Sequence, residues 1–543
     1  MQAESLYFYP FMDCTSTTLP YGQTGYFSKI VVDYINGSPD LEPFYQYPVS
    51  MKGLAASIAA RKQFTGNRPL LVRELKRVYA ALPSHQEVYG NIEKLSDDRT
   101  FTICTAHQPC IFTGTLFFIY KILHVIKLAK ECKASMPDYN FVPVYYMGSE
   151  DADLDELGKI WLNGEQLTWD TKQTGAVGRM NTKGLDKIIY RIEGELSVLP
   201  FGHELISLLK DCYLSSPDIT TATFKLVHAL FAEYGLVVFL PDNPEYKKAM
   251  IPVFEEDLFQ QKSSAIVEQS ITALSKNYKV QANPREINLF YLKDNIRERF
   301  EREDDQWKVV NTEIIFSRDE LKQELYSNPE RFSPNVILRG IYQETILPNI
   351  AFIGGGGELA YWLEFRNLFE YHNVPYPLLV LRNSFLYIEK KWKEKIEKIG
   401  FTETDIFKSQ DLLLNELVRR ESQQQITLLE EVSNADEYYG HLKSIAGNID
   451  ETLVTHVSAL QTRALKSLLG LEKKLLRAEK KKFDDQQRQI VNIKSALFPQ
   501  NSLQERIDNF MPFYARWGKE FIDMILKKSL TQEQEFVVLT EEE

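Results

Sequence analysis

Short apolar runs, each ending in a polar or glycine-rich turn, recur through the first 385 residues of the chain. Five of them are 100–105, 142–147, 236–240, 350–353 and 378–381. They alternate with stretches that have the period of an amphipathic helix, which is typical of strands buried in a parallel sheet. The pattern predicts an α/β fold, a doubly wound parallel sheet whose functional site lies at the carboxyl edge of the strands.

Two insertions are expected within this core, at about 155–235 and 245–335. In the second, residues 287–310 alternate between apolar and polar side chains, which predicts a small antiparallel meander. The core with its insertions would span residues 1–385.

From residue 386 to residue 500 the apolar positions recur mostly at three- and four-residue steps, the pattern of long amphipathic helices. We expect the apolar positions from Leu442 to Leu475 to form an antiparallel coiled coil with residues 412–429. Such a coiled coil most often joins two copies into a homodimer, and the alternative is a hairpin within one chain. Residues 501–543 would return to pack on the core.

Composition and charge narrow the function classes. The net charge is −12, so no basic excess is available to displace counterions from nucleic acid. The five cysteines form no CxxC pair and no zinc-type array, which fits a reducing cytoplasm. The most apolar stretch, 111–128, is interrupted by lysine and histidine, so we expect a buried helix there and no membrane span.

A cluster of acids follows the second apolar run. Gly148 and Ser149 end the run, and the carboxylates that follow are Glu150, Asp151, Asp153, Asp155 and Glu156. Carboxylates this close repel one another, which favours a bound cation, a basic substrate group or acid–base chemistry. The alternative is a set of solvated acids at a helix N-terminus, which the helix dipole favours.

The turn after the first run contains His107 and Gln108, and Lys121 lies in the apolar helix that follows. Free amides at such a turn attract an anion, and the histidine could act as a general acid or donate to an oxyanion. The alternatives are a structural turn histidine and a lysine that reaches solvent.

Four glycines, Gly354, Gly355, Gly356 and Gly357, follow the fourth run and would allow a ligand close approach to backbone with positive φ. Gly355, Gly357 and Ala360 fit the loose dinucleotide pattern G-x-G-x-x-A, but the next strand ends in Arg382 where a ribose-binding acid is expected. The alternative is a tight turn for close packing.

Two arginines are candidates to bind substrate carboxylates, Arg339 and Arg382, because the guanidinium fork matches that geometry. Arg339 would share a helix face with Gln343. Either arginine could equally be a buried ion-pair partner.

Near the C-terminus, aromatic residues surround Gln504, Arg506 and Asn509. This segment could hold an adenine and its phosphates, or it could pack against the core.

Taken together, four segments resemble one family, BshC, the proposed cysteine ligases of bacillithiol biosynthesis. They are HQPCIFTGTLFFIYKI, SEDADLDEL, RGIYQETILPNIAFIGGGGELAYW and QERIDNFMPFYARWG, in this order. The resemblance runs nearly end to end. It implies a Rossmann-like core related in shape to class I synthetase nucleotidyl-transfer domains, an α-helical coiled coil that makes a homodimer, and a second cleft able to take ADP.

The resemblance also implies the reaction, in which the carboxyl group of L-cysteine is joined to the amine of glucosaminyl-malate in the last step of bacillithiol biosynthesis. Mg²⁺ would take part if ATP is used. One departure is Ala152, which stands where the family's acidic motif often has a histidine. If that histidine were catalytic, this protein would be impaired or would use His107 instead.

The leading hypothesis is therefore an amide-forming ligase. Its expected catalytic residues are His107, Gln108, Glu150, Asp151 and Asp153. Its expected substrate-binding residues are Lys121, Arg339, Gln343, Glu358, Tyr361, Trp362 and Arg382. Nucleotide would contact the four glycines together with Gln504, Arg506 and Asn509. The alternatives are a nucleotidyltransferase-like enzyme acting on another small acid, and a non-catalytic coiled-coil dimer that scaffolds thiol synthesis.

Overall fold

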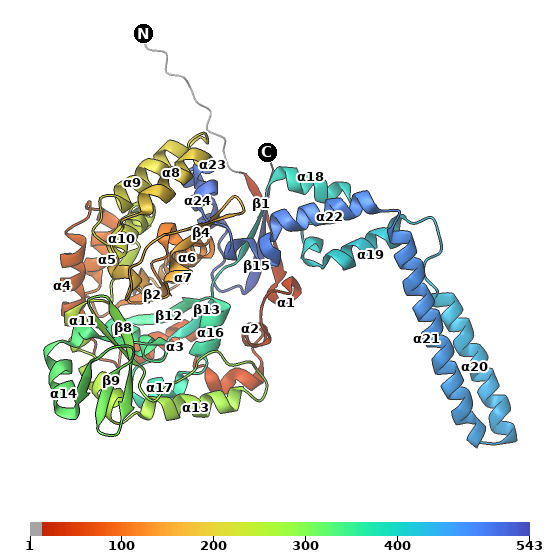
Figure 1. Cartoon of the computed structure of the whole chain (residues 1–543), viewed down its shortest axis with the longest axis horizontal. Coiled ribbons are helices and arrows are strands. Elements are labelled where there is room, and N and C mark those ends of the chain that lie inside the picture. Colours follow the sequence, from red (N-terminus) through yellow and green to blue (C-terminus); the bar gives the residue numbers. More distant parts are fainter. Residues whose placement is uncertain (1–12, 543) are drawn as a thin grey trace, which may run out of the picture. The chain divides into compact units, whose positions relative to one another are not determined.

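The computed structural model describes residues 13–542. The first residues of the predicted core, 1–12, lie outside this part. The chain divides into a core unit, residues 13–386 with 502–539, and a helical unit, residues 387–501 with 540–542. The elements of both units are labelled in Figure 1. No helix in the described part is long and apolar enough to cross a membrane.

The core unit is built around a five-stranded parallel sheet in the order β13–β12–β2–β3–β6. Its strands are β2 (Thr100–His107), β3 (Asn140–Met147), β6 (Val237–Phe239), β12 (Asn349–Gly354) and β13 (Leu378–Leu381). The first strand of this sheet in chain order, β2, is central, and the chain adds strands first on one side of it and then on the other. This is the Rossmann-type doubly wound order, so the predicted fold is confirmed.

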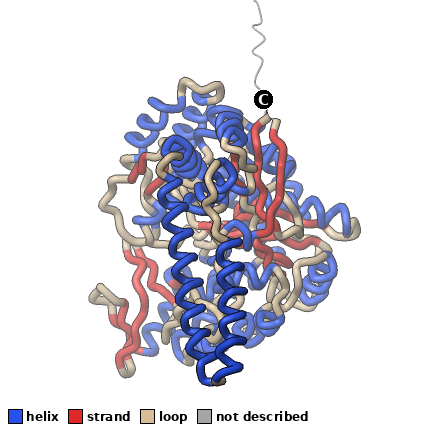
Figure 2. Tube along the Cα trace, turned by 90° about the vertical axis from the view of Figure 1, so that its right-hand side faces the viewer, coloured by secondary structure: helices blue, strands red, loops and turns tan. Residues whose placement is uncertain are grey.

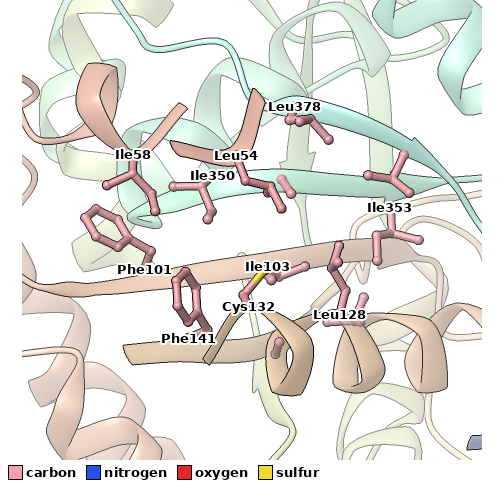
Figure 3. Close-up of a cluster of buried hydrophobic side chains, with 14 of the residues drawn as sticks. Leu54, Ile58, Phe101, Ile103, Leu128, Cys132, Phe141, Ile350, Ile353 and Leu378 are labelled. Atoms are coloured by element: carbon pink, nitrogen blue, oxygen red, sulfur yellow. The ribbon is translucent and has the colours of Figure 1, made fainter. Parts of the chain in front are cut away.

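Helices α3 (Met51–Arg61) and α6 (Phe117–Ser135) pack on this sheet. β2 is buried almost throughout, which explains why it is a continuous apolar run without alternation. Leu54 and Ile58 of α3, Leu128 and Cys132 of α6, and Ile103 of β2 meet in one buried cluster (Figure 3). Removing such side chains from water is the main stabilising contribution to this part of the fold.

The loop between β2 and α6 departs from the expected helix over 111–128. Phe112, Thr113 and Gly114 have φ of 49°, 67° and 69°, so the backbone is left-handed there and α6 begins only at Phe117. The amide group of Asn509 donates to the carbonyl oxygens of Phe112, at 3.0 Å, and of Gly114. The C-terminal part of the core unit thus holds the loop that opens α6.

The two insertions lie before and after β6. The first contains the hairpin β4 (Lys159–Leu162) and β5 (Glu165–Thr168), then α8 (Leu185–Leu196), α9 (Gly202–Tyr213) and α10 (Ile219–Phe231). The second contains an antiparallel sheet in the order β10–β9–β8–β7–β11, which confirms the predicted meander. Its strands are β7 (Leu289–Lys293), β8 (Ile296–Glu303), β9 (Gln306–Val309), β10 (Ile315–Ser317) and β11 (Phe332–Pro334).

A three-stranded sheet has the order β1–β15–β14, formed by β1 (Cys14–Pro20), β15 (Glu535–Glu541) and β14 (Phe385–Ile388). Besides α3, the helices before β2 are α1 (Tyr21–Thr24), α2 (Lys29–Ile35), α4 (Arg68–Tyr79) and α5 (Gln86–Lys94). Those between β3 and β13 also include α7 (Leu154–Leu157), α11 (Pro244–Lys248), α12 (Ile251–Phe259), α13 (Lys262–Leu274), α14 (Arg318–Ser327), α15 (Val336–Ile346), α16 (Gly356–Trp362) and α17 (Arg366–Tyr371). Helices α23 (Met511–Trp517) and α24 (Lys519–Lys528) follow near the C-terminus, and α24 packs on α6.

The helical unit contains the expected coiled coil as a hairpin within one chain, with α20 (Leu429–Ile449) and α21 (Thr452–Lys480) side by side (Figure 2). The predicted pairing with residues 412–429 is confirmed only in part, because α21 packs mainly on α20, whereas α19 (Gln410–Glu421) packs on both α21 and α22 (Asp484–Leu497). The remaining helix of this unit is α18 (Lys390–Lys398).

The expected continuous helix from Leu442 to Leu475 is broken at Asp450, where the backbone is extended. The Asp450 carboxylate accepts hydrogen bonds from the backbone N–H and the hydroxyl of Thr452, at 2.8 and 2.7 Å, and so begins α21. Gly447 allows the two helices to approach, because a Cβ there would lie 3.2 Å from Val454. The turn occurs within an unbroken apolar pattern, which is why the pattern did not reveal it.

Candidate active site

A cavity of about 340 Å³ opens at the carboxyl edge of the parallel sheet. It lies beyond the ends of β2, β3 and β6 and is closed by residues of α15 and α16. Ligands of doubly wound sheets bind at this edge, where the strand order reverses. The lining residues that can carry charge or donate hydrogen bonds include His107, Gln108, Lys121, Glu150, Asp151, Glu156, Arg297, Asn335, Arg339, Glu358 and Tyr361.

The acidic loop, residues 148–157, does not act as one cluster. Glu150 is buried and forms a salt bridge with Lys247, whose side chain is fully buried, and it accepts a hydrogen bond from Ser333 at 3.0 Å. Lys247 also donates to the carbonyl oxygen of Glu330 at 3.0 Å. Glu150 therefore anchors the loop to neighbouring segments and has little freedom to take part in proton transfer.

Asp153 is exposed and is the N-cap of the short helix α7, where its carboxylate accepts the backbone N–H of Glu156 at 3.0 Å. The contacts of Asp153 therefore support its interpretation as an acid at a helix N-terminus. Asp151 and Glu156 line the cavity instead. Burial, together with the neighbouring Asp153 and Asp151 carboxylates, raises the pKa of Glu156.

A chain of hydrogen bonds links Asp151 to His107, the last residue of β2. The amide nitrogen of Gln108 donates to Asp151 at 3.1 Å, and the amide oxygen of Gln108 accepts from Nδ1 of His107 at 2.9 Å. Nε2 of His107 is buried and has no hydrogen-bond partner among the described residues. Burial, reinforced by the Lys121 ammonium, lowers the pKa of His107 to about 3, so the imidazole is neutral and Nε2 is a hydrogen-bond acceptor.

Lys121 is buried and paired. Its ammonium lies 2.5 Å from the Glu358 carboxylate and donates to the carbonyl oxygen of Ala106 at 2.6 Å. Burial lowers the pKa of Lys121, against the pull of Glu358. Two of its three N–H groups are thus engaged, and the third is available to the cavity that Lys121 lines.

The glycine turn, Gly354–Gly357, differs from the expectation, since none of the four glycines has positive φ. Glu358 accepts the backbone N–H of Gly355 at 2.8 Å, so a side chain of the protein occupies the position where a phosphate was expected. A Cβ at Gly354 would lie 2.9 Å from the Phe352 ring, and one at Gly356 would lie 3.1 Å from Val31. Close packing accounts for these two glycines.

Arg339 faces the cavity from α15. Its guanidinium donates to the side-chain oxygen of Gln343 at 3.2 Å, which confirms the predicted shared helix face, and to the hydroxyl of Tyr361 at 3.2 Å. Both partners are neutral. Trp362 lies away from the cavity lining, fully buried and stacked on Phe352 at 4.6 Å.

Arg382 does not line the cavity. It is buried and forms a salt bridge with Glu505 at 2.7 Å, and it also donates to the hydroxyl of Ser384 at 2.9 Å. The ion-pair alternative is therefore the one that the contacts of Arg382 support. Gln504 and Asn509 are buried, Arg506 is exposed, and none of the three belongs to the cavity lining.

Three residues of the site were not predicted. Lys247 neutralises Glu150, Glu156 faces the cavity, and Arg297 reaches it from β8 of the inserted sheet. Glu156 was visible in the acidic cluster. Lys247 and Arg297 carried no local signal, because their roles depend on segments that are distant in the sequence.

Two of the residues expected to contact a nucleotide already have hydrogen-bond partners within the protein. Gly355 and Asn509 direct their hydrogen bonds to other groups of the protein. Within residues 13–542 no group of three or more His, Cys, Asp or Glu side chains is arranged to hold a metal ion. Mg²⁺ would therefore need oxygen ligands from a substrate and water.

Comparison with known proteins identifies relatives along the whole chain. A family model described as "Bacillithiol biosynthesis BshC, N-terminal Rossmann-like domain" matches residues 12–383, and one described as "Bacillithiol biosynthesis BshC, C-terminal coiled-coil domain" matches residues 385–541. A protein of Flavobacterium johnsoniae named "Putative cysteine ligase BshC" is 39% identical, covering 97% of this chain and 99% of its own. Proteins with the same name from Flavobacterium psychrophilum and Cytophaga hutchinsonii are 40% and 38% identical, covering 94% and 90% of this chain and 96% and 92% of their own.

Proposed function

This chain belongs to the BshC family of bacillithiol biosynthesis, and on that premise we propose that it joins the carboxyl group of L-cysteine to the amine of glucosaminyl-malate. The name of the relatives supports an amide-forming ligase. One structural observation carries the proposal. Arg339 and Asp151 line the same cavity with opposite charges, and among the described residues each forms hydrogen bonds with neutral groups only.

Two opposite charges whose hydrogen-bond partners in the protein are neutral suit a substrate that carries both a positive and a negative group. A carboxylate of the malyl group would take the guanidinium of Arg339, whose planar fork matches a carboxylate. The ammonium of the amino sugar would lie at Asp151, which attracts it and can accept its proton. This arrangement brings the amine to the cavity edge where Lys121 has a free N–H group.

The reaction requires a cysteine whose carboxyl carries a leaving group. The amine nitrogen attacks the carboxyl carbon, the C–N bond forms, and the bond from carbon to the leaving group breaks. Asp151 takes one proton from the ammonium before the attack, and the second proton, lost as the C–N bond forms, leaves with the departing group. Nε2 of His107 accepts the second N–H of the amine and so orients its lone pair. This differs from the expected donation to an oxyanion, because the Gln108 hydrogen bond places the His107 proton on Nδ1.

Charge that develops on the attacked carbonyl oxygen needs a donor. The third N–H of Lys121 is the best placed, since Glu358 and Ala106 engage the other two. Glu358 then positions the ammonium and does not contact substrate.

The proposal is tested in cells that lack this gene by measuring their thiols after labelling, with mass spectrometry. Complementation with the wild-type gene should restore bacillithiol and remove accumulated glucosaminyl-malate. D151N should lower product formation by about 10²–10⁴-fold, the usual contribution of a general base. D153N is the matched control in the same loop, and it should retain activity because asparagine also caps helices.

Full bacillithiol output from D151N would remove Asp151 from the mechanism. Unchanged bacillithiol in cells without the gene would contradict the ligase function itself. Reconstitution of the purified protein with L-cysteine and glucosaminyl-malate, with and without ATP and Mg²⁺, then identifies the source of the leaving group.

We also propose that two copies of the chain associate in the cytoplasm through the helical unit. The hairpin has large apolar side chains that are exposed within one chain, among them Ile445 (45%), Ile449 (77%) and Leu453 (42%). Light scattering of the purified protein should give twice the mass of one chain, and I449E with L453E should shift it toward the mass of one chain.

A further inference from the structure

Salt bridges within the protein occupy two of the three cations that were expected to bind the carboxylates of the substrate. Malate has two carboxylates, and three cations were expected to bind them. Lys121 is paired with Glu358 at 2.5 Å, and Arg382 is paired with Glu505 at 2.7 Å. Only Arg339 retains a guanidinium whose hydrogen-bond partners are neutral. A dicarboxylate bound here needs a second cation from elsewhere.

Arg297 is the other guanidinium that lines the cavity. It comes from β8 of the inserted antiparallel sheet and is half-buried. It has no salt bridge among the described residues, and its buried Nε has no hydrogen-bond partner. Its guanidinium carbon lies 4.0 Å from the centre of the Phe290 ring, which holds the side chain against the inserted sheet.

The surroundings of Arg297 compensate its positive charge only incompletely. Burial lowers the pKa of Arg297, against the pull of the nearby Asp151 and Glu150 carboxylates. Glu150 is already neutralised by Lys247. A buried charge without a hydrogen-bonded counter-ion is costly, and a bound anion removes that cost.

The position of Arg297 also favours a ligand. A second cavity, of about 540 Å³, adjoins the first and shares Arg297 as a lining residue. Its walls include Asp153, Gln173, Asn295 and Thr312. Arg297 therefore lines open space in two cavities, and among the described residues no side chain forms a hydrogen bond with its Nε.

We propose that Arg297 binds the carboxylate that distinguishes a malyl group from a lactyl group, while Arg339 binds the carboxylate that both groups share. This inference rests on the proposed function and deepens it. Arg297 is then a specificity-determining residue for the dicarboxylate, and the inserted sheet supplies it to the Rossmann-like core. The two guanidinium groups approach the substrate from separate parts of the fold, α15 and β8.

The test is calorimetric binding by the purified full chain of two ligands, glucosaminyl-malate and the matching glucosaminyl-lactate. R297Q should weaken binding of the malate compound by about tenfold to a hundredfold, the loss expected for one hydrogen-bonded charge pair. It should leave binding of the lactate compound within about twofold. R339Q should weaken both ligands, and R297K should retain part of the preference for malate.

Arg299 provides the control, since it lies on the same strand and its guanidinium is paired with Glu301 at 2.9 Å. R299Q should bind both ligands as the wild type does. Thermal unfolding of every variant shows whether the inserted sheet is intact, and R297K keeps the test valid if R297Q unfolds.

Equal weakening of both ligands by R297Q, or no weakening of either, would overturn the role of Arg297 while leaving the ligase proposal in place. A wild-type protein that binds neither ligand would overturn the ligase proposal and this inference with it. A wild type that prefers the malate compound, with the preference lost in R297Q alone, is the supporting result.

Discussion

The acidic loop after β3 and the glycine turn after β12 lie at the same edge of one sheet, and their polar groups are used in opposite ways. In the acidic loop, Asp151 and Glu156 keep carboxylates that line the cavity and form no salt bridge with another described residue. In the glycine turn, Glu358 takes the free N–H of Gly355 and pairs with Lys121. A loop binds a ligand with the groups that its own fold leaves without partners, whatever its motif suggests.

The largest expected effect concerns Glu150, the residue of the acidic loop that has a charged partner in the protein. E150Q removes the counter-ion of Lys247, whose side chain is fully buried, and should lower the free energy of unfolding by about 3–5 kcal/mol. Urea unfolding followed by intrinsic fluorescence measures the change. The double variant E150Q/K247M should recover most of the loss, because no buried charge is then left alone. If E150Q were as stable as the wild type, Glu150 would be as free as Asp151.

The glycine turn should be sensitive to volume. G354A places a methyl group 2.9 Å from the Phe352 ring, which cannot move away because it is stacked on Trp362 at 4.6 Å. Overpacking of this kind costs about 1–3 kcal/mol of folding free energy, measured by the same unfolding experiment. An unchanged stability would mean that the turn is open and could admit a ligand.

The uncharged state of His107 should be visible in the pH dependence of stability. The pKa of His107 is lowered to about 3 from its ordinary value of 6.5, so only the unfolded chain binds the proton between these values. Stability therefore decreases as pH falls, by about 1.4 kcal/mol between pH 8 and pH 5.5 from this group. H107Q should remove that part of the dependence, measured as the difference between wild type and variant at each pH. Identical pH profiles for wild type and H107Q would mean that the pKa of His107 is the same in the folded and the unfolded chain.

The smallest expected effect concerns Gly357 in the glycine turn. A Cβ at Gly357 would meet no atom within 4 Å, and the residue lies in α16. G357A should therefore raise the free energy of unfolding by about 0.5–1 kcal/mol, since alanine favours a helix more than glycine does. Ligase activity should not change. A loss of activity without loss of stability would show that a substrate approaches the turn closely, which the acidic loop alone is expected to permit.

The architecture followed from local patterns. Five apolar runs ending in turns became the five parallel strands, because a strand buried on both faces must be apolar along its length. The break at Asp450 did not follow, since apolar spacing continues through the turn and only the cap formed with Thr452 marks it. A hairpin of two helices and one long helix share the same periodicity.

The sequence predicted the location of the candidate site more reliably than it predicted which residues line it. His107, Asp151 and Arg339 line the predicted edge of the sheet. Arg382 does not, because Glu505 neutralises it from a segment far along the chain. Arg297 was missed for the converse reason, since it becomes a ligand candidate only when the inserted sheet folds over the edge of the core. Pairing between distant charges is a tertiary property that single-sequence patterns do not contain.

The buried pair of Arg382 and Glu505 also has a consequence during synthesis. Its members are 123 residues apart in sequence, and residues 387–501 of the helical unit are encoded between them. At about 5–20 residues per second, a ribosome needs roughly 6–25 s to make that stretch. During this interval the nascent core lacks the counter-ion for Arg382 and the clamp that Asn509 places on the loop before α6. The domain that begins first is thus completed last, and we expect its core to reach full stability only after residue 509 has been made.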